Sequence, residues 1–300
     1  MSDAAAPDSF VRVREGAGER RREFPPLPEP LPAPVYDNHT HMDIADGDEP
    51  LSWEEQLDRA GRVGVRGVVQ VGIDLETSRW GAELAARDPR VLAAVALHPN
   101  DAPLLAAQGL LDDHVAGIAE LAARPRVRAV GETGLDYYRT EGEAALAAQR
   151  RSFEEHIAIA REYGRALQIH DRDAHPDIPR ALDRVGAPDR VVLHCFSGDA
   201  VFAELAVERG WYLSFAGTVT FKNAVGLREA LAVVPRSRLL VETDAPFLAP
   251  TPHRGRPNSA YLVPHTVRFI AEQLGADLAE LCARLAANTE AVYGSWDDPG

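Results

Sequence analysis

The sequence predicts an α/β fold, a TIM (β/α)8 barrel in a single domain, and three observations favour it. The chain has 300 residues, which suits one α/β barrel, and 45% of them are hydrophobic, enough for a large core. Short runs rich in β-branched residues recur eight times from residue 34 onward. Stretches with apolar residues at intervals of three and four separate them, as expected of helices packed on a sheet. Eight such units predict a closed parallel barrel, because each crossover is right-handed and covers the sheet.

The apolar runs give the expected strands in chain order: residues 34–41, 65–72, 91–99, 127–136, 166–172, 190–198, 211–217 and 238–246. The amphipathic stretches give the expected helices: 53–64, 75–88, 112–124, 145–164, 174–186, 199–210 and 223–235. A doubly wound open sheet is the rival architecture. The number of units disfavours it, and no G-x-G-x-x-G follows the first strand.

Residues 1–33 differ in composition from the rest of the chain. They contain acidic residues, an arginine cluster and the segment "EFPPLPEPLPAP", which favours extended polyproline conformation over helix or central strand. We expect a disordered or loosely attached proline-rich tail at 1–33 and the barrel domain at 34–296. A docking peptide for a partner is the alternative interpretation of the tail.

Charge and cysteine content limit the environment and the partners. No run approaches the roughly 18 to 20 apolar residues of a membrane span, and the N-terminus lacks a secretory signal. Two cysteines exclude a disulfide framework, so a cytoplasmic protein is expected. The net charge of −14 argues against broad attraction to nucleic acid or anionic lipid. A nucleic-acid substrate therefore needs a local positive site, which bound metal cations would supply.

Histidines gather where the expected strands end. His39 and His41 close the first strand, and His98, His170 and His194 close the third, fifth and sixth. An H-x-H pair alone is near chance level in a chain with ten histidines. Its position matters more, because catalytic residues of such barrels come from the C-terminal ends of the strands.

Residues two apart along a strand share a face, which extends this pattern to carboxylates. The expected pairs and triplets on one face are Asp37 with His39 and His41, Val130 with Glu132, Gln168 with His170, Val192 with His194, and Glu242 with Asp244. If these faces point inward, imidazoles and carboxylates converge, and divalent cations offset their buried charge. Six mixed ligands exceed what one catalytic zinc uses and fit two metals sharing a carboxylate. Each acid also has an interpretation without metal. Asp37 could be a buried acid bonded to backbone amides, and Glu132 could form an ion pair with an arginine.

Six motifs then occur in a fixed order: "DNHTH" at 37–41, "ALHP" at 96–99, "GETGLD" at 131–136, "HDRDA" at 170–174, "HCFSG" at 194–198 and "ETDAP" at 242–246. "TFKNA" at 220–224 and "HRGRPN" at 253–258 accompany them. In this order the sequence resembles the TatD-like metal-dependent deoxyribonucleases, a family of amidohydrolase-type barrels, from residue 35 to about 294. Ala96 and Ala260 depart from the family's pattern, and both concern loop shape more than ligation.

The resemblance implies two divalent metal ions, Mg²⁺, Mn²⁺ or Zn²⁺. It implies one metal held by His39, His41, Glu132 and Asp244, and a second held by Glu132, His170 and His194, so that Glu132 bridges. We expect catalytic roles for Glu132, Asp244 and Glu242: Asp244 is the candidate general base, and Glu242, like Asp37, is a candidate to orient ligands.

Three further residues are expected to contact substrate. Arg172, two residues beyond His170, and Arg254 in a late loop are candidates to bind phosphate oxygens. An ordinary ion pair is the alternative for each arginine. His98 is expected near the substrate without ligating metal.

The resemblance implies hydrolysis of DNA phosphodiester bonds by a metal-bridged hydroxide, in a 3′–5′ exonuclease acting on single-stranded ends. No membrane and no obligatory protein partner are expected. Two alternatives remain: an amidohydrolase-type hydrolase of a small-molecule amide or ester, which the fold does not distinguish, and a non-catalytic scaffold with structural metals.

Overall fold

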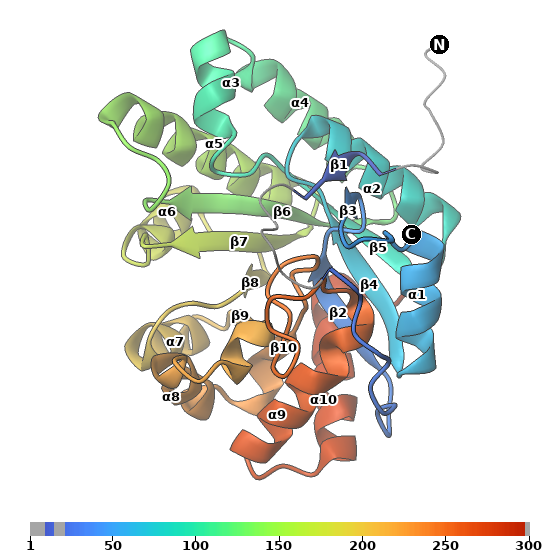
Figure 1. Cartoon of the computed structure of the whole chain (residues 1–300). Coiled ribbons are helices and arrows are strands. Elements are labelled where there is room, and N and C mark those ends of the chain that lie inside the picture. The colour runs from blue at the N-terminus through green and yellow to red at the C-terminus, as the bar shows by residue number, and fades with distance from the viewer. Residues whose placement is uncertain (1–9, 15–21, 298–300) are drawn as a thin grey trace.

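The computed structural model describes residues 10–14 and 22–297, which form an eight-stranded parallel barrel surrounded by helices (Figure 1). The barrel strands are β2 (Val35–Thr40), β4 (Val65–Val71), β5 (Val91–Val95), β6 (Val127–Asp136), β7 (Ala166–Arg172), β8 (Val191–Leu193), β9 (Tyr212–Phe215) and β10 (Leu239–Val241). Their order in the sheet follows the sequence, and neighbouring strands pair in parallel. The predicted fold class is confirmed.

Helices alternate with the strands. They are α1 (Trp53–Arg62), α2 (Leu75–Arg87), α3 (Ala102–Gln108), α4 (Leu111–Ala122), α5 (Glu143–Glu162), α6 (Asp177–Val185), α7 (Ala200–Glu208), α8 (Val225–Val233), α9 (Val263–Gln273) and α10 (Leu278–Tyr293). Short 3₁₀ turns are η1 (Gly217–Thr220), η2 (Arg236–Arg238) and η3 (Ala260–Leu262). Among the described residues, no helix combines the length and apolar character that a membrane span requires.

Contacts between β2 and the segment after β10 close the barrel along what we call the seam. The N–H of His41 donates to the carbonyl of Ala245 at 2.8 Å, and the N–H of Asp244 donates to the carbonyl of His39 at 2.9 Å. The Asn38 side chain donates to the carbonyl of Val241 at 2.7 Å. The seam therefore places the ends of β2 and β10 side by side.

Two apolar clusters occupy the two faces of the barrel sheet. The larger one lies between strands and helices, with Val68 and Val95 among its members. The smaller one takes alternate strand residues, such as Val69 and Leu92, together with the end of α10. In it Tyr36 stacks on Trp296, with ring centroids 4.1 Å apart. Apolar side chains thus fill the barrel toward the N-terminal ends of its strands, and polar residues occupy the C-terminal ends of the strands.

Several expected strands end earlier than the apolar runs. Strand β8 ends at Leu193 and β10 at Val241, so His194, Glu242 and Asp244 lie just beyond the strands. Asp244 has a φ of 52°, outside the strand region. Strand alternation therefore does not set the direction of Asp244 relative to Glu242. His194 still continues the sheet, because its N–H donates to the carbonyl of Ile169 at 3.1 Å, and it faces the barrel interior as Val192 does.

The described parts of the N-terminal segment make defined contacts with the barrel. Strand β1 (Arg12–Val13) pairs in parallel with β3 (Ile44–Ala45). The carbonyl of Pro25 accepts the Tyr261 hydroxyl at 2.6 Å, and the buried Leu31 donates from its N–H to the carbonyl of Val63 at 3.0 Å. The expectation of a loosely attached tail does not hold for residues 10–14 and 22–33, because these contacts fix their backbone. For 1–9 and 15–21 it lies outside the described residues.

A buried histidine on α5 supports the loop after β5. His156 accepts the N–H of Leu97 on Nε2 at 3.0 Å, and its Nδ1 donates to the carbonyl of Ser152 at 2.7 Å. Both nitrogens are used by the neutral ring, and burial lowers the pKa of His156 to about 4.

This burial predicts acid sensitivity with a definite sign. The unfolded state binds a proton at this histidine below about pH 6.5, whereas the folded state does so only near pH 4, so stability falls as pH drops through that window. We expect His156 to contribute a slope of about 1.4 kcal/mol per pH unit there. Urea unfolding of wild type and H156Q at pH 7 and 5 measures it. An equal pH dependence in both proteins would contradict the assignment.

Candidate metal centre

Two imidazoles at the end of β2 face each other. The Nε2 atoms of His39 and His41 are 3.2 Å apart. His39 Nδ1 lies 3.1 Å from the side-chain oxygen of Gln168, and His41 Nδ1 lies 2.9 Å from the carbonyl of Val71. Each Nδ1 faces an acceptor and so carries the proton, which leaves a lone pair on each Nε2 of the neutral rings. Two opposed lone pairs require a cation or a proton between them.

The Gln168 amide has one orientation that satisfies its surroundings. Its NH₂ group donates to the carbonyl of Asn38 at 2.8 Å and to the Tyr293 hydroxyl at 2.6 Å. The amide oxygen therefore faces His39. Gln168 on β7 and Tyr293 on α10 thereby fix the tautomer of His39, as partners of metal-binding histidines do.

The two oxygens of Glu132 face two different groups of imidazoles. Oε2 lies 3.5 Å from His39 Nε2 and 3.8 Å from His41 Nε2. Oε1 lies 2.7 Å from His170 Nδ1 and 2.9 Å from His194 Nε2. Burial opposes ionisation of Glu132, but the neighbouring histidines, His194 first, hold its pKa well below the ordinary value. One carboxylate thus lies between two sets of nitrogen donors.

Two acids orient the histidines of the second set. His194 Nδ1 lies 3.3 Å from Glu242, whose Oε1 also accepts the N–H of Cys195 at 2.7 Å. His170 Nε2 lies 3.2 Å from Asp136. Burial lowers the pKa of His194, but Glu132 and Glu242 outweigh it and raise that pKa well above its ordinary value. Glu242 is fully buried behind His194, so it orients an imidazole and does not reach the open side.

His98 differs from His39 and His41 in which ring nitrogen carries the proton. Its Nδ1 accepts the N–H of Asn100 at 3.1 Å, so the neutral ring carries its proton on Nε2. That nitrogen lies 3.4 Å from Glu132 Oε1. His98 thus presents a hydrogen-bond donor to the centre where His39 and His41 present lone pairs.

Asp244 completes the set at the seam. Its Oδ1 lies 3.8 Å from His39 Nε2 and 3.6 Å from His41 Nε2, and its side chain is 16% exposed. Asp37 instead accepts from the N–H and the hydroxyl of Thr243, at 2.8 and 2.5 Å, and from the N–H of His39 at 3.3 Å. It holds the two chain segments together and does not face the donors.

The six expected ligand residues, together with His98, meet in three overlapping groups in which the donor atoms lie within 4.8 Å of one another. These groups are His39 with Glu132 and His194, His39 with His41 and Asp244, and His98 with Glu132 and His170. All six expected metal ligands are therefore in one cluster, at the C-terminal end of the barrel strands.

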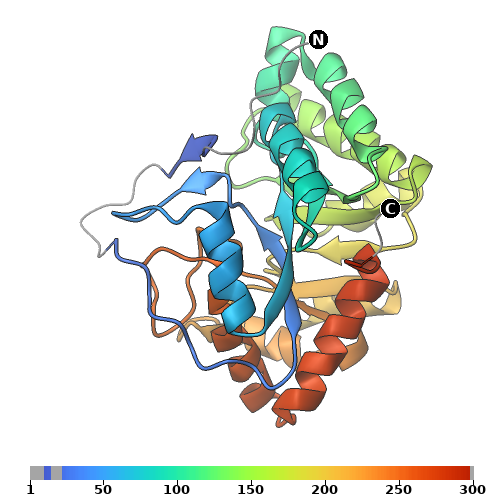
Figure 2. The ribbon, with the colours of Figure 1, turned by 90° about the vertical axis from the view of Figure 1, so that its right-hand side faces the viewer.

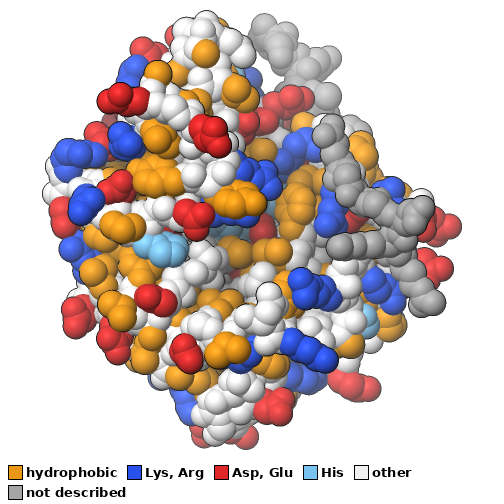
Figure 3. All heavy atoms as spheres, turned by 60° about the vertical axis from the view of Figure 1, so that its left-hand side comes forward, with side chains coloured by type: hydrophobic (Ala, Val, Ile, Leu, Met, Phe, Trp, Pro, Cys, Tyr) orange, Lys and Arg blue, Asp and Glu red, His pale blue; other side chains and the backbone are white. Residues whose placement is uncertain are grey.

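The two expected phosphate-binding arginines lie against aromatic rings. Arg172 is 4.0 Å from the centroid of Tyr138, and the exposed Arg254 is 4.4 Å from that of Phe221. Arg172 ends β7 two residues beyond His170, whereas within the described part of the chain no hydrogen bond or ion pair joins Arg254 to the donor cluster. Figure 3 shows acidic and basic side chains interspersed over one face of the described chain, so no broad basic surface offsets the net charge of −14 there.

The sequence reasoning missed three residues of the cluster: Asp136, Tyr293, and Gln168 as an orienting group. Asp136 follows Glu132 by four residues on the ten-residue strand β6, so the two-residue period was a usable signal. Tyr293 had no such signal, because a helix 125 residues further on brings it to Gln168.

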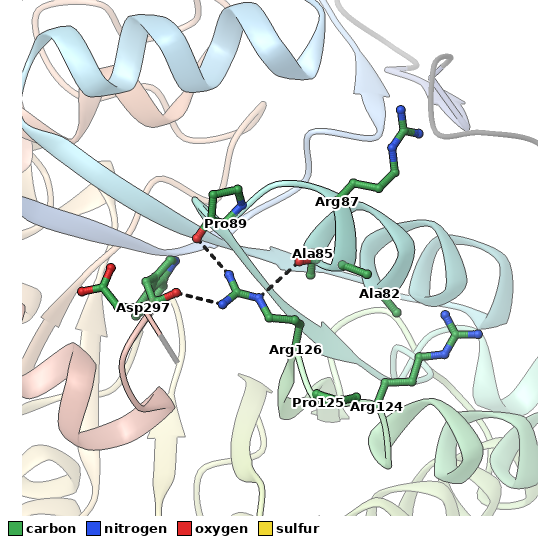
Figure 4. Close-up of a pocket in the computed structure, with 10 residues that line it drawn as sticks. Ala82, Ala85, Arg87, Pro89, Arg124, Pro125, Arg126 and Asp297 are labelled. Atoms are coloured by element: carbon green, nitrogen blue, oxygen red, sulfur yellow. Dashed lines mark hydrogen bonds between the residues drawn. The ribbon is translucent and has the colours of Figure 1, made fainter. Parts of the chain in front are cut away.

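A surface pocket of about 630 Å³ lies at the other end of the barrel (Figure 4). The end of α2 and the loops before β5 and β6 line it. Arg126 there donates to the carbonyls of Ala85 at 3.2 Å and Pro89 at 2.9 Å. This pocket contains none of the expected site residues and is separate from the donor cluster.

A family model described as "TatD related DNase" matches residues 36–294, the span that supplies every member of the cluster. The chain belongs to this family. The "Uncharacterized metal-dependent hydrolase TatD" of Mycobacterium tuberculosis is 44% identical over 263 residues, 87% of this chain and 98% of the relative. The "3'-5' ssDNA/RNA exonuclease TatD" of Citrobacter rodentium is 35% identical over 80% of this chain and 91% of its own length.

Solved structures agree with this placement in the TatD family. The crystal structure of YJJV, a TatD homologue from Escherichia coli, superimposes with a TM-score of 0.75 at 27% identity. It covers 87% of this chain and 98% of that chain. The expected membership of a family of metal-dependent hydrolases is thereby confirmed.

The Gln168 contact generates a prediction about metal binding. Q168M removes the acceptor of His39 Nδ1, so we expect the affinity for Mn²⁺ or Zn²⁺ to fall about 10- to 100-fold. Calorimetric titration of the metal-free protein at fixed pH measures this. Q273M, at an exposed position at the end of α9, is the matched control. Unchanged affinity in a folded Q168M protein would show that Gln168 has no part in orienting the ligand.

Proposed function

We propose that this TatD-family protein hydrolyses phosphodiester bonds of DNA with two divalent metal ions, releasing nucleotides from the 3′ ends of single strands. The observation that carries the proposal is the pair of opposed imidazole lone pairs, His39 and His41, beside the two-sided Glu132 carboxylate. The name of the Citrobacter rodentium relative supports the substrate and the polarity.

The donor set fits two cations. His39, His41, Glu132 and Asp244 would hold one metal. His170 and His194 would hold the second, together with Glu132 as the bridging carboxylate. Mixed nitrogen and oxygen donors suit Zn²⁺ and Mn²⁺ and are compatible with Mg²⁺. Bound divalent ions supply Lewis acidity, which activates water near neutral pH and neutralises phosphate oxygens.

Side chains of the cluster are assigned proton transfer, ligand orientation and phosphate binding. Asp244 is the most exposed carboxylate of the cluster, which supports it as the group that accepts a proton from the attacking water. Glu242 holds His194 in place from behind. His98 offers an N–H beside Glu132, suited to hydrogen-bond a phosphate oxygen.

Two further parts of the proposal concern phosphate contacts and the compartment. Arg172, at the end of β7, is a candidate to bind phosphate, and Arg254 is a more remote one. Both cysteines, Cys195 and Cys282, are free thiols, which supports the cytoplasm as the compartment.

The test is metal-dependent nucleotide release from a 3′-labelled single-stranded oligonucleotide with Mg²⁺, Mn²⁺ or Zn²⁺. We expect E132Q to reduce the rate by about a thousandfold or more, because neither cation keeps its shared ligand. E272Q, at an exposed site on α9, is the matched control and should retain wild-type activity.

Two outcomes would contradict the proposal. Intact DNA alongside turnover of a small amide or ester panel would favour a small-molecule hydrolase. Equal activity of E132Q and wild type would remove the bridging role of Glu132.

A further inference from the structure

The segment around β1 precedes the residues that the family model matches, yet it lies at the end of the barrel that carries the donor cluster. Arg12 pairs with Ile44, three residues beyond His41. The N–H of Val11 donates to the carbonyl of Asp43 at 3.0 Å, and that of Arg14 donates to the carbonyl of Ala45 at 3.0 Å. Both ribbon views show β1 beside β3 (Figures 1 and 2).

Arg14 anchors this segment across the seam. It donates to Asp46 and to the carbonyl of Pro246, both at 2.7 Å. Its guanidinium lies 5.2 Å from the centroid of the Phe247 ring, and that ring is 6.4 Å from the ring of His41. The N-terminal segment therefore contacts both chain segments that carry His41 and Asp244.

The Arg12 guanidinium has a hydrogen-bond partner at Nε but none at Nη2 among the described residues. Its Nε donates to Asp43 at 2.6 Å, and Asp43 is fixed in turn by the Gln70 side chain at 2.9 Å. The Nη2 nitrogen of Arg12 is buried without a hydrogen-bond partner among the described residues, while a quarter of the side chain is exposed. A buried donor without an acceptor is costly, so it indicates a missing acceptor.

Arg12 borders the chain segment that carries His41. Its partner Asp43 follows His41 by two residues, and Gln70, which holds Asp43, precedes Val71, whose carbonyl faces His41 Nδ1. The Arg12 charge also acts on Asp101, in the loop after β5 that contains His98, where burial nevertheless raises the pKa. Arg12 thus lies near two loops that border the donor cluster, but outside the cluster itself.

We propose that Arg12 binds a phosphate of the substrate strand adjacent to the one being cleaved, so that the N-terminal segment supplies a part of the substrate site from outside the matched region. This inference rests on the proposed function. A guanidinium has a planar fork that matches phosphate oxygens, and Asp43 orients it through Nε while Nη2 has no acceptor among the described residues. The rival role of Arg12 is only to neutralise the buried Asp43.

The experiment compares two substrates in the metal-loaded full chain. Oligothymidylate offers neighbouring phosphates, whereas thymidine 5′-p-nitrophenyl phosphate contains a single phosphodiester. We expect R12Q to raise KM for oligothymidylate about tenfold and to leave KM for the small ester unchanged. The slope of log KM against log salt should fall by about 0.7, the value for one phosphate contact on a single strand. R66Q is the matched control, because Arg66 pairs with Asp297 at the other end of the barrel.

The alternatives give different results. An equal loss on both substrates, or an unchanged salt slope, would overturn the inference and leave Arg12 as the counter-charge of Asp43. If R12Q does not fold, the comparison is made with R12K, which keeps the charge but not the fork: a raised KM on oligothymidylate alone supports the inference, and equal KM values overturn it. A wild-type protein that cleaves neither substrate overturns the proposed function and this inference with it.

Discussion

The buried Glu132 carboxylate is the group on which the arrangement of the site depends. Five imidazoles from the ends of four strands lie between 2.7 and 3.8 Å from its oxygens. A carboxylate in this position is costly to ionise unless positive charge surrounds it. This requirement constrains the orientation of the rings, because each imidazole must present the correct nitrogen toward Glu132.

A second layer of contacts meets this requirement by holding the far nitrogen of each ring. The partners are the Gln168 side chain, the carbonyl of Val71, the N–H of Asn100, Asp136 and Glu242. They come from strands or from the turns directly after them, where the backbone is fixed by the sheet. Ring orientation is therefore set by the barrel strands and the segments that follow them.

Sequence patterns predicted the barrel and the ligand residues for different physical reasons. The eight strands carry enough buried β-branched residues to be recognised one by one, and the histidines mark their ends. Alternation described His39 and His41 correctly, since their Nε2 atoms lie 3.2 Å apart, although β2 has a register shift against β4 between Asp37 and Thr40. It does not extend to Asp244, since β10 ends before this residue and its φ is 52°. Tyr293 and Arg12 reach the site region through tertiary contacts that leave no local period, so their roles appear only in three dimensions.

The seam determines when, during synthesis of the chain, the donor set can be complete. Asp37 and Thr243 are 206 positions apart, and the bonds that join β2 to the turn after β10 span almost the whole domain. Contacts of such separation form late, because the intervening chain must first exist and then be ordered. On the ribosome His39 and His41 emerge early, but Asp244 emerges only after the strands between them have been made. A nascent chain that stops short of residue 244 thus carries an incomplete donor set, and any hydrolytic activity of this site is withheld until the seam can form.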